Sequence, residues 1–512
     1  MKQSGKRIRK TRLFVAQTDT RGKVKLEYKS TSTPDLAVLR AATSALVHRN
    51  ADEDDPEQQI VQENDDETCA FLSAPYTSPD GSSPPVVRMH AVAAEFMGYK
   101  YGIPITGVNG LQFSPYSHHT HRKNTLSKLE TATSKFQFNI YDGGVVEWVK
   151  MKGKEVVAVV LILIWVDDWV YTGVKWAVRE CRALLKSSFK FQGMQPIEGP
   201  DKRQIEFLKI RIMHCVSENW VIWDQSSYAG EVGKGFAGGA PPVYAPLEWV
   251  ITDQDDQDDK KREKTGTAEE AAMRTTMLQF AGKAQQLRLS RPDVKYACSV
   301  LSSHASRPSI EALNALGKVA RYLKVPKVLK FSTSSDSPHR PKDLTIAVEC
   351  DADFSGRKYA RSGYNVFVGS NPVEWGSETQ TIRTTNPHES EMVAGCDGLK
   401  SAQGVQNVLG SLSFFQLYSP KVIDEAIQVL QDSGSNVKLN NGEGVSKRSR
   451  SMEARYLFVK GAVISGSAES THIPRKYNTA DIHTHPLHRS RFKVLCELLN
   501  VVELDNSHKL EC

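Results

Sequence analysis

An apolar run that ends in two adjacent aspartates constrains this chain more than any other feature of its sequence. The run covers residues 156–164, is rich in β-branched side chains, and leads into Trp165-Val-Asp-Asp168. Apolar residues resume directly afterwards, at residues 169–173. Two apolar stretches separated by a short polar turn are typical of a β-hairpin. We therefore predict a hairpin whose tight turn carries both Asp167 and Asp168.

Two neighbouring carboxylates in a turn repel each other, and a bound divalent cation relieves that repulsion. Magnesium prefers hard oxygen ligands and is usually held by one or two carboxylates together with substrate phosphates. Asp167 and Asp168 are therefore candidates for half of a two-metal phosphoryl-transfer site. The alternative is an ordinary solvated turn, because Asp-Asp pairs are common there.

Length and composition limit the class of protein. A chain of 512 residues suggests two to four domains, and 40% hydrophobic residues suffice for packed cores. The net charge of +7 is compatible with binding a polyanion. The eight cysteines are scattered without C-x-x-C spacing, which supports neither a disulfide framework nor a zinc site. With no secretory signal and no apolar run long enough to span a bilayer, we expect a soluble intracellular protein without membrane contact.

A second set of acids lies in the C-terminal part of the chain. Three of its four members follow expected strands or begin an expected helix, where an open α/β sheet presents its ligands. The set comprises Asp351, Glu391, Asp432 and Asp481. Four hard ligands could hold two magnesium ions for phosphodiester cleavage. Taken singly, each acid is equally compatible with a surface charge or a helix cap.

The intervening pattern indicates separate helical and α/β regions. Helical spacing of apolar residues predicts a helix over 308–325, and its basic face (Lys318, Arg321, Lys324) fits either solvent or a phosphate backbone. Strands are expected at 344–350, 364–368 and 379–383, with a further short strand through Trp375. The charged segment 251–266 is expected to be a linker or exposed loop.

Motifs that include Trp165-Val-Asp-Asp168, Cys350-Asp-Ala-Asp-Phe354 and the segment 478–487 stand in an order that resembles one known family. This family is the Pol polyproteins of copia-type retrotransposons, in their reverse transcriptase and ribonuclease H portion. The resemblance covers nearly the whole chain. Its clearest pairs are residues 66–72 with D-V-x-x-A-F-L, 110–115 with G-L-K-Q-S-P, 165–168 with Y-V-D-D, 321–324 with R-Y-L-K, 350–354 with C-D-A-D-W and 478–487 with N-x-A-D-I-F-T-K-P-L.

The resemblance implies a fold class and a domain order. We expect an α+β right-hand polymerase with fingers, palm and thumb, followed by an α/β RNase H-like domain. The expected parts are fingers and palm at 1–225, a helical thumb or connection at 226–335, and the RNase H-like domain at 336–512. The implied function is RNA-directed DNA synthesis combined with hydrolysis of RNA paired with DNA.

The resemblance also assigns roles to individual residues. Asp66, Asp167 and Asp168 would be the polymerase metal ligands, and Asp351, Glu391, Asp432 and Asp481 those of the nuclease. The metal would be Mg²⁺, with Mn²⁺ as an alternative. Phe71 would be the steric gate against a ribose 2′-hydroxyl, or a plain core aromatic. Substrate contacts are also expected from Arg12 and Gln112.

The implied partners are an RNA template, a DNA primer, an RNA–DNA hybrid, deoxynucleoside triphosphates and other Pol or Gag segments of the element. The implied location is the cytoplasm, within a virus-like particle, or the nucleus, or both. Metal binding is not expected of His118, His119 and His121, which fit a polar helix entry. His483 and His485 lie beside Asp481 in sequence and fit an exposed loop, with support of a metal ligand as the alternative.

The sequence also departs from the family pattern. Trp165 replaces a tyrosine, and Lys209 replaces a glycine. Gly395 and Gly398 interrupt the helix expected after Glu391, each at a cost of about 1 kcal/mol relative to alanine. Two rival functions therefore remain: a catalytically inactive remnant that only binds nucleic acid, and a protein that retains only the nuclease.

Overall fold

The computed structural model describes residues 16–18, 24–26, 36–68, 70–78, 87–88, 101–102, 114–192, 202–249, 268–354, 359–442 and 457–504. These residues fall into two compact units, which are treated separately below. The first unit contains the described residues within 1–35, 53–196 and 411–417. The second contains those within 36–52, 197–410 and 418–512. The charged segment 251–266 lies outside the described residues.

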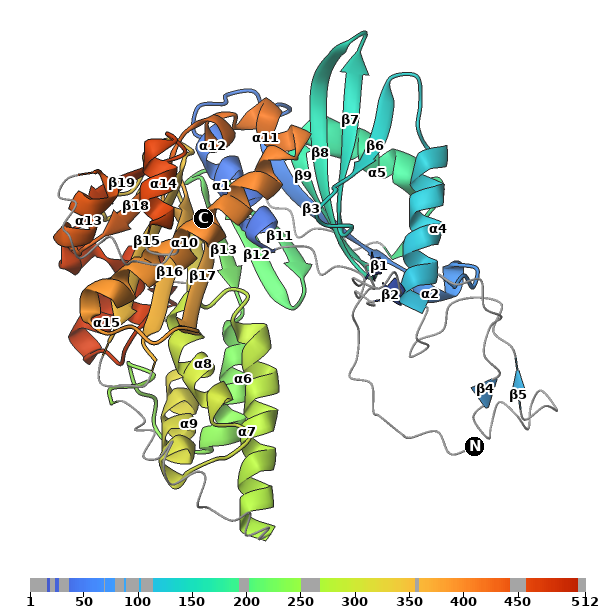
Figure 1. Ribbon diagram of the computed structural model, residues 1–512. Coiled ribbons are helices and arrows are strands. Elements are labelled where there is room, and N and C mark those ends of the chain that lie inside the picture. Colours follow the sequence, from blue (N-terminus) through green and yellow to red (C-terminus); the bar gives the residue numbers. More distant parts are fainter. Residues whose placement is uncertain are drawn as a thin grey trace. The chain divides into compact units, whose positions relative to one another are not determined.

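The first unit is built on an antiparallel six-stranded sheet in the order β10-β3-β9-β8-β7-β6 (Figure 1). Its strands are β3 (Ile60–Glu67), β6 (Ser134–Phe138), β7 (Val145–Lys152), β8 (Glu155–Trp165), β9 (Asp168–Val174) and β10 (Phe191–Gln192). Its helices are α2 (Ala70–Ser73), α4 (Ser114–Lys128), α5 (Lys175–Lys186) and most of α11 (Ser413–Tyr418). Two short strand pairs complete it, β1 (Ala16–Thr18) with β2 (Val24–Leu26) and β4 (Val87–Arg88) with β5 (Tyr101–Gly102).

The predicted hairpin is confirmed, with one correction. Strands β8 and β9 pair antiparallel and are joined by Val166 and Asp167. Asp167 therefore lies in the turn, whereas Asp168 is the first residue of β9 and not a turn residue. Val166 adopts a φ of 57°, an uncommon conformation for a β-branched residue. The turn thus holds a backbone conformation that side chains of this type normally avoid.

The second unit contains a mixed five-stranded sheet in the order β17-β16-β15-β18-β19 (Figure 1). Strands β15, β16 and β17 pair antiparallel, whereas β18 and β19 run parallel to β15. The strands are β15 (Ile346–Asp353), β16 (Arg361–Val368), β17 (Asn371–Thr379), β18 (Ile427–Gln431) and β19 (Ala468–His472). This α/β arrangement agrees with the RNase H-like domain that was expected there.

Opposite faces of strand β15 contact different elements, as the alternation of side chains along a strand requires. The long helix α10 (Pro387–Gly410) covers one face, where a Cβ on Gly398 would lie 2.4 Å from Cys350 Sγ. The 3₁₀ helix η4 (Thr479–His483) covers the other face, where Glu349 accepts a 2.8 Å hydrogen bond from the Thr479 backbone. Residues 349 and 351 therefore share the face that η4 covers.

The prediction of a strand at 379–383 is wrong. Strand β17 ends at Thr379, opposite Arg361 at the start of β16, and the following residues lead into α10. The short strand expected through Trp375 is β17 itself. The strand expected at 344–350 is β15, which continues to Asp353, so Asp351 lies within the strand and not after it.

The second unit also holds an antiparallel sheet in the order β11-β12-β13-β14-β20. Its strands are β11 (Lys202–Phe207), β12 (Ile210–Cys215), β13 (Trp220–Asp224), β14 (Lys327–Phe331) and β20 (Val501–Glu503). Four α-helices of the described residues lie between β13 and β14 in sequence: α6 (Ser226–Ala237), α7 (Ala268–Leu287), α8 (Lys295–Ser303) and α9 (Ile310–Tyr322). The remaining elements are α12 (Lys421–Asp424), α13 (Gly434–Asn440), α14 (Phe458–Ile464), α15 (Arg489–Leu498) and the 3₁₀ helices η1 (Pro292–Val294) and η3 (Arg475–Tyr477).

The helix predicted at 308–325 is confirmed as α9, and the Ser309 hydroxyl caps it by accepting from the Ala312 backbone. Its basic side chains do not form a simple solvated face. Arg321 and Lys324 donate hydrogen bonds to backbone carbonyls of the segment that follows α6. That segment is thereby fixed against α9.

Helix α1 (Leu36–Asn50) belongs to the second unit, although the expected boundaries put it with residues 1–225. The Ser44 hydroxyl donates to the Val368 carbonyl, and the Arg40 guanidinium donates to the Val373 carbonyl. The expected division at residues 225 and 335 concerns functional domains, which compactness alone does not test, and it stays a prediction. Among the described residues, no helix is both long and apolar enough to cross a bilayer.

Candidate functional site

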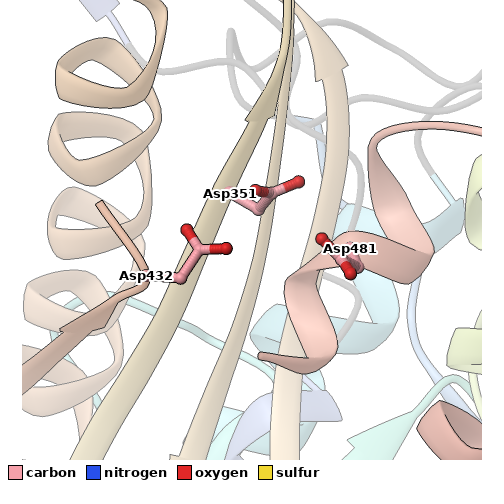
Figure 2. Close-up of side chains that lie close together, drawn as sticks. All are labelled: Asp351, Asp432 and Asp481. Atoms are coloured by element: carbon pink, nitrogen blue, oxygen red, sulfur yellow. The ribbon is translucent and has the colours of Figure 1, made fainter. Parts of the chain in front are cut away.

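Three of the four C-terminal acids meet in space, as the sequence led us to expect. Asp351, Asp432 and Asp481 each offer a carboxylate oxygen, and these oxygens all lie within 4.8 Å of one another (Figure 2). Asp351 comes from β15, Asp432 directly follows β18, and Asp481 lies in η4. The parallel register that pairs Cys350 with Gln431 brings Asp432 alongside Asp351. We call these three residues, together with Glu391, the acid cluster.

Glu391 completes the acid cluster from helix α10. It does not belong to the trio within 4.8 Å, but it lines the same cavity as Asp351 and Asp432. Its carboxylate accepts a hydrogen bond from the Ala352 backbone, while its buried Oε2 atom has no hydrogen-bond partner. Glu391 is therefore a neighbour of the trio with an unused oxygen.

Burial and mutual repulsion raise the pKa values of three members of the acid cluster, Asp351, Glu391 and Asp432. Desolvation is the largest cause for Asp351, followed by the charge of Asp481, and the result lies well above the ordinary value. The pKa of Glu391 is likewise raised well above its ordinary value, first by desolvation and then by the charge of Asp351. The pKa of Asp432 is raised by desolvation and by Asp481. Each anion is thus costly in this place without a compensating positive charge.

The two carboxylate oxygens of Asp481 lie in different environments. Its Oδ2 atom accepts a 2.8 Å hydrogen bond from Arg491, and Arg475 lies 3.9 Å away. Its Oδ1 atom is buried and has no hydrogen-bond partner. A carboxylate oxygen without a donor, next to two other carboxylates, has the chemistry of a divalent-cation ligand. The donor set therefore fits such a cation.

A hydrogen-bond network holds η4 against β15. The sequence alone did not predict this network. Thr484 donates a 2.6 Å hydrogen bond to Asp351 Oδ2, and Asn478 donates to the Cys350 carbonyl. Beneath them, the buried Glu349 carboxylate accepts from Thr479 and pairs with Arg340 at 3.0 Å. Asn478 and Thr484 stand inside the motif at 478–487, which is the only sequence signal that could have singled them out.

His483 is buried and does not lie in an exposed loop, contrary to our expectation. Its Nε2 atom lies 2.7 Å from Asn365 Oδ1, and burial lowers its pKa to about 3. The imidazole is therefore neutral and part of the core. His485, in contrast, lines the cavity of the acid cluster.

This cavity has a volume of about 590 Å³. Besides acids it is lined by Arg475, His485 and Trp249. A site that combines clustered carboxylates with cationic and aromatic side chains is suited to a phosphate-containing ligand held through a divalent ion.

The first unit brings two of the three proposed polymerase ligands together. Asp66 on β3 stands directly opposite Asp168 on β9, so their side chains project from the same face of the sheet. The Glu67 backbone N–H donates to the Asp167 carbonyl, which places the turn beside β3. The pKa of Asp66 is raised, first by desolvation and then by the charge of Asp167. The group within 4.8 Å described above does not include these three acids.

Behind Asp66, the neighbouring residue Glu67 is buried in a polar cluster. Its Oε2 atom lies 3.1 Å from His118 Nε2 and accepts from the Trp169 indole at 3.3 Å. His118 lies near the start of α4, as predicted, but it is a buried partner of Glu67 and not a solvated side chain. Nothing in the sequence had indicated this pair.

The three expected substrate contacts cannot be placed. Arg12 and Gln112 lie outside the described residues, and Phe71 belongs to α2, but its side chain is not among those described.

Comparison with curated proteins finds retrotransposon relatives. The Pol polyprotein of transposon RE1 from Arabidopsis thaliana is 26% identical over 233 residues, which are 44% of this chain and 15% of that polyprotein. The Pol polyprotein of transposon TNT 1-94 from Nicotiana tabacum is 23% identical over 349 residues, covering 67% of this chain and 24% of the relative. The matched stretch therefore spans a quarter or less of these relatives.

Among solved structures, RNase H1 from the archaeon Halobacterium salinarum NRC-1 is 18% identical, with a TM-score of 0.20. The match covers 27% of this chain and 94% of that one. No protein family model matches the chain.

Proposed function

This chain is a homologue of the Pol polyproteins of copia-type retrotransposons, and we propose that it cleaves the RNA strand of an RNA–DNA hybrid and synthesises DNA. The observation that carries the nuclease part is the convergence of Asp351, Asp432 and Asp481 from three separate elements. Buried acids with raised pKa values are costly to keep, and such costs are typical of functional sites.

Asp351, Glu391, Asp432 and Asp481 would hold Mg²⁺, with Mn²⁺ as the alternative. The unpartnered oxygens of Asp481 and Glu391 support this assignment. When bound, the ions would supply an activated water and stabilise charge on the oxygens of the scissile phosphate.

The residues of the chain itself position these ligands. Thr484 donates to one oxygen of Asp351 and leaves the other for a cation, while Arg491 does the same for Asp481. Arg475 also lines the cavity, and its positively charged guanidinium would attract a phosphate backbone. These contacts hold the acids in one arrangement before any substrate arrives.

The polymerase part of the proposal rests on Asp66, Asp167 and Asp168, with an RNA template, a DNA primer and deoxynucleoside triphosphates as substrates. The direct pairing of Asp66 with Asp168, beside a hairpin turn that carries Asp167, supports it. Phe71 would serve as the steric gate, and Arg12 and Gln112 would contact substrate.

Cleavage of a labelled RNA–DNA hybrid by the purified protein in Mg²⁺ tests the nuclease. We expect RNA cleavage by the wild type, loss of at least a hundredfold in rate for Asp351→Asn as expected for a metal ligand, and no change for Asp424→Asn. Asp424 is an exposed acid of α12 and serves as the matched control. A wild-type protein that binds the hybrid without cleaving it would instead support the inactive remnant.

A further inference from the structure

A second cavity of about 820 Å³ adjoins the cavity of the acid cluster. It lies between helix α9, the first residue of α15, and the segment 238–249, which we call the aromatic loop. Tyr244 and Trp249 of this loop line the cavity and remain 43% and 38% exposed. Large aromatic side chains left accessible in a hollow commonly mark a binding site.

Cationic side chains accompany both rings. The Arg489 guanidinium lies 4.1 Å from the centre of the Tyr244 ring, and the Lys318 ammonium lies 4.7 Å from that of Trp249. Arg321 also lines the cavity, whereas Glu248, which pairs with Lys318, is the one acid among the described residues that line it. Three cations against one anion favour an anionic ligand that also carries a flat apolar surface.

The aromatic loop is held in place before any ligand binds. Arg321 Nε donates to the Pro241 carbonyl at 2.7 Å. Lys324 Nζ donates to the carbonyls of Gly238 and Ala240 at 2.5 and 2.6 Å. A loop that is already ordered loses little conformational entropy when it binds a partner.

The two cavities share a border. Glu248 and Trp249 line both of them, so Trp249, the last residue of the aromatic loop, lies where the two cavities meet. A ligand that extends across this border must present phosphates at the acid cluster and a stackable ring at the aromatic loop. A nucleic-acid strand has this alternation, and aromatic stacking platforms with flanking cations are how such strands are commonly gripped.

We propose that the aromatic loop binds one nucleotide of the strand whose scissile phosphate occupies the acid cluster. The base stacks on Tyr244 or Trp249, and Arg489 contacts the adjoining phosphate. This inference rests on the proposed nuclease function and adds to it a fixed grip beside the cut. It predicts that the strand is held at a defined distance from the cleavage position.

Fluorescence of 2-aminopurine, which falls when the base stacks, tests the proposal. The probe is placed at successive positions of an unpaired RNA overhang that continues the RNA strand of a hybrid, because a base within the duplex is already stacked, and binding is measured in Mg²⁺ with the Asp351→Asn protein to block cleavage. We expect quenching confined to one or two adjacent positions. Of Tyr244→Ala and Trp249→Ala, the variant that removes the stacking ring should abolish the quench and raise Kd roughly tenfold, the size of one lost stacked base. Tyr244→Phe and Trp249→Phe should retain both within about twofold.

The control is Tyr141→Ala, because Tyr141 is a 63% exposed tyrosine of the first unit. Arg489→Met gives a second readout that does not alter the rings. It should lower the slope of log Kd against log salt concentration by about one, as expected when one phosphate contact is lost. An unchanged Kd in both Tyr244→Ala and Trp249→Ala, together with an unchanged salt dependence in Arg489→Met, would overturn the proposal.

Three further outcomes are decisive. If the free nucleoside monophosphate is quenched and the hybrid is not, the cavity binds mononucleotides and the assignment to a strand is wrong. If the wild type cleaves the hybrid but no position is quenched, this inference fails while the proposed nuclease stands. If quenching is observed without wild-type cleavage, the nuclease fails and the nucleotide grip remains.

Discussion

At the scale of single residues, the acid cluster opposes folding unless a cation lies within it. The pKa values of Asp351, Glu391 and Asp432 are all raised, in each case first by burial and then by a neighbouring acid. A carboxyl group whose pKa is higher in the folded state binds its proton more tightly there. The folded protein therefore loses stability as pH rises and these groups ionise.

Replacing one of these acids should stabilise the metal-free protein. In EDTA, Asp351→Asn removes a buried charge but keeps an acceptor for Thr484, so we expect its unfolding free energy to exceed that of the wild type by on the order of 1–2 kcal/mol at pH 8. The gain should be small below the ordinary carboxyl pKa of about 4, should grow as pH rises from there toward the raised pKa, and should level off above it. Thermal unfolding between pH 4 and pH 8 measures this difference.

Magnesium should reverse the order of stability of the wild type and Asp351→Asn. Saturating Mg²⁺ stabilises only a protein that binds it, so it should raise the Tm of the wild type and leave that of Asp351→Asn nearly unchanged. Subsequent EDTA should restore the original difference. A stability gain that shrinks with rising pH, or an equal response of both proteins to Mg²⁺, would contradict this account.

The sequence identified the acids but not what holds them. Asp351 and Asp481 could be predicted because each stands in a motif with a known order along the chain, whereas Asp432 was predicted from its place directly after a short apolar run. Glu349 and Arg340 carry no such signal, since a buried ion pair beneath a strand looks like two ordinary surface charges in sequence. Their partners are fixed only when η4 returns to the sheet from more than a hundred residues away.

At the scale of elements, helix α10 contains two glycines whose cost in helix propensity is explained by their packing. Gly395 and Gly398 looked like interruptions of a helix, yet α10 is continuous from Pro387 to Gly410. A Cβ on Gly398 would lie 2.4 Å from Cys350 Sγ, and one on Gly395 would lie 2.9 Å from the Gln431 side chain. The glycines therefore allow the helix to approach the sheet that carries the acids.

Two alanine substitutions on this one helix should act in opposite directions. Gly398→Ala forces α10 away from β15, and we expect a loss of about 1–3 kcal/mol in unfolding free energy, as for an overpacked core. Gly404→Ala, where no atom lies within 4 Å, should gain about 0.5–1 kcal/mol from helix propensity alone. Chemical denaturation of both variants measures the difference, and equal effects would mean that close approach does not explain Gly398.

The strand wrongly predicted at 379–383 has the complementary explanation. Thr379, Thr381 and Ile382 have high strand propensity, which is a local property. A strand also needs a partner, and β16 begins at Arg361, opposite Thr379. The hairpin of β8 and β9 was predictable because its two strands are each other's partners and lie next to each other in sequence.

At the scale of the whole molecule, the compact units do not follow the order of the chain. Helix α1 lies early in the sequence but packs on β16 and β17, through hydrogen bonds that join residues more than three hundred positions apart. No periodicity within residues 36–50 could indicate this, because nearly every position of the helix is buried. Motif order therefore predicted the presence of an α/β domain but not the set of segments that packs with it.

The two groups of acids lie in different units, so their proposed activities should be separable by single substitutions. Asp168→Asn removes the carboxylate opposite Asp66, and it should reduce primer extension on an RNA template by at least a hundredfold while hybrid cleavage stays within about twofold. Asp351→Asn should give the reverse pattern. Both activities are measured on the same primed hybrid, with Asp424→Asn as the control.

The pattern of losses distinguishes the remaining possibilities, because each cluster would bind its own ions. Cleavage that persists in Asp168→Asn, from a protein that shows no extension even as wild type, would leave only the nuclease. Loss of both activities in either variant, with unchanged Tm, would mean that the two clusters do not act independently. Retained extension in Asp168→Asn would remove that residue from the polymerase site, since an amide cannot supply the anionic ligand that the metal requires.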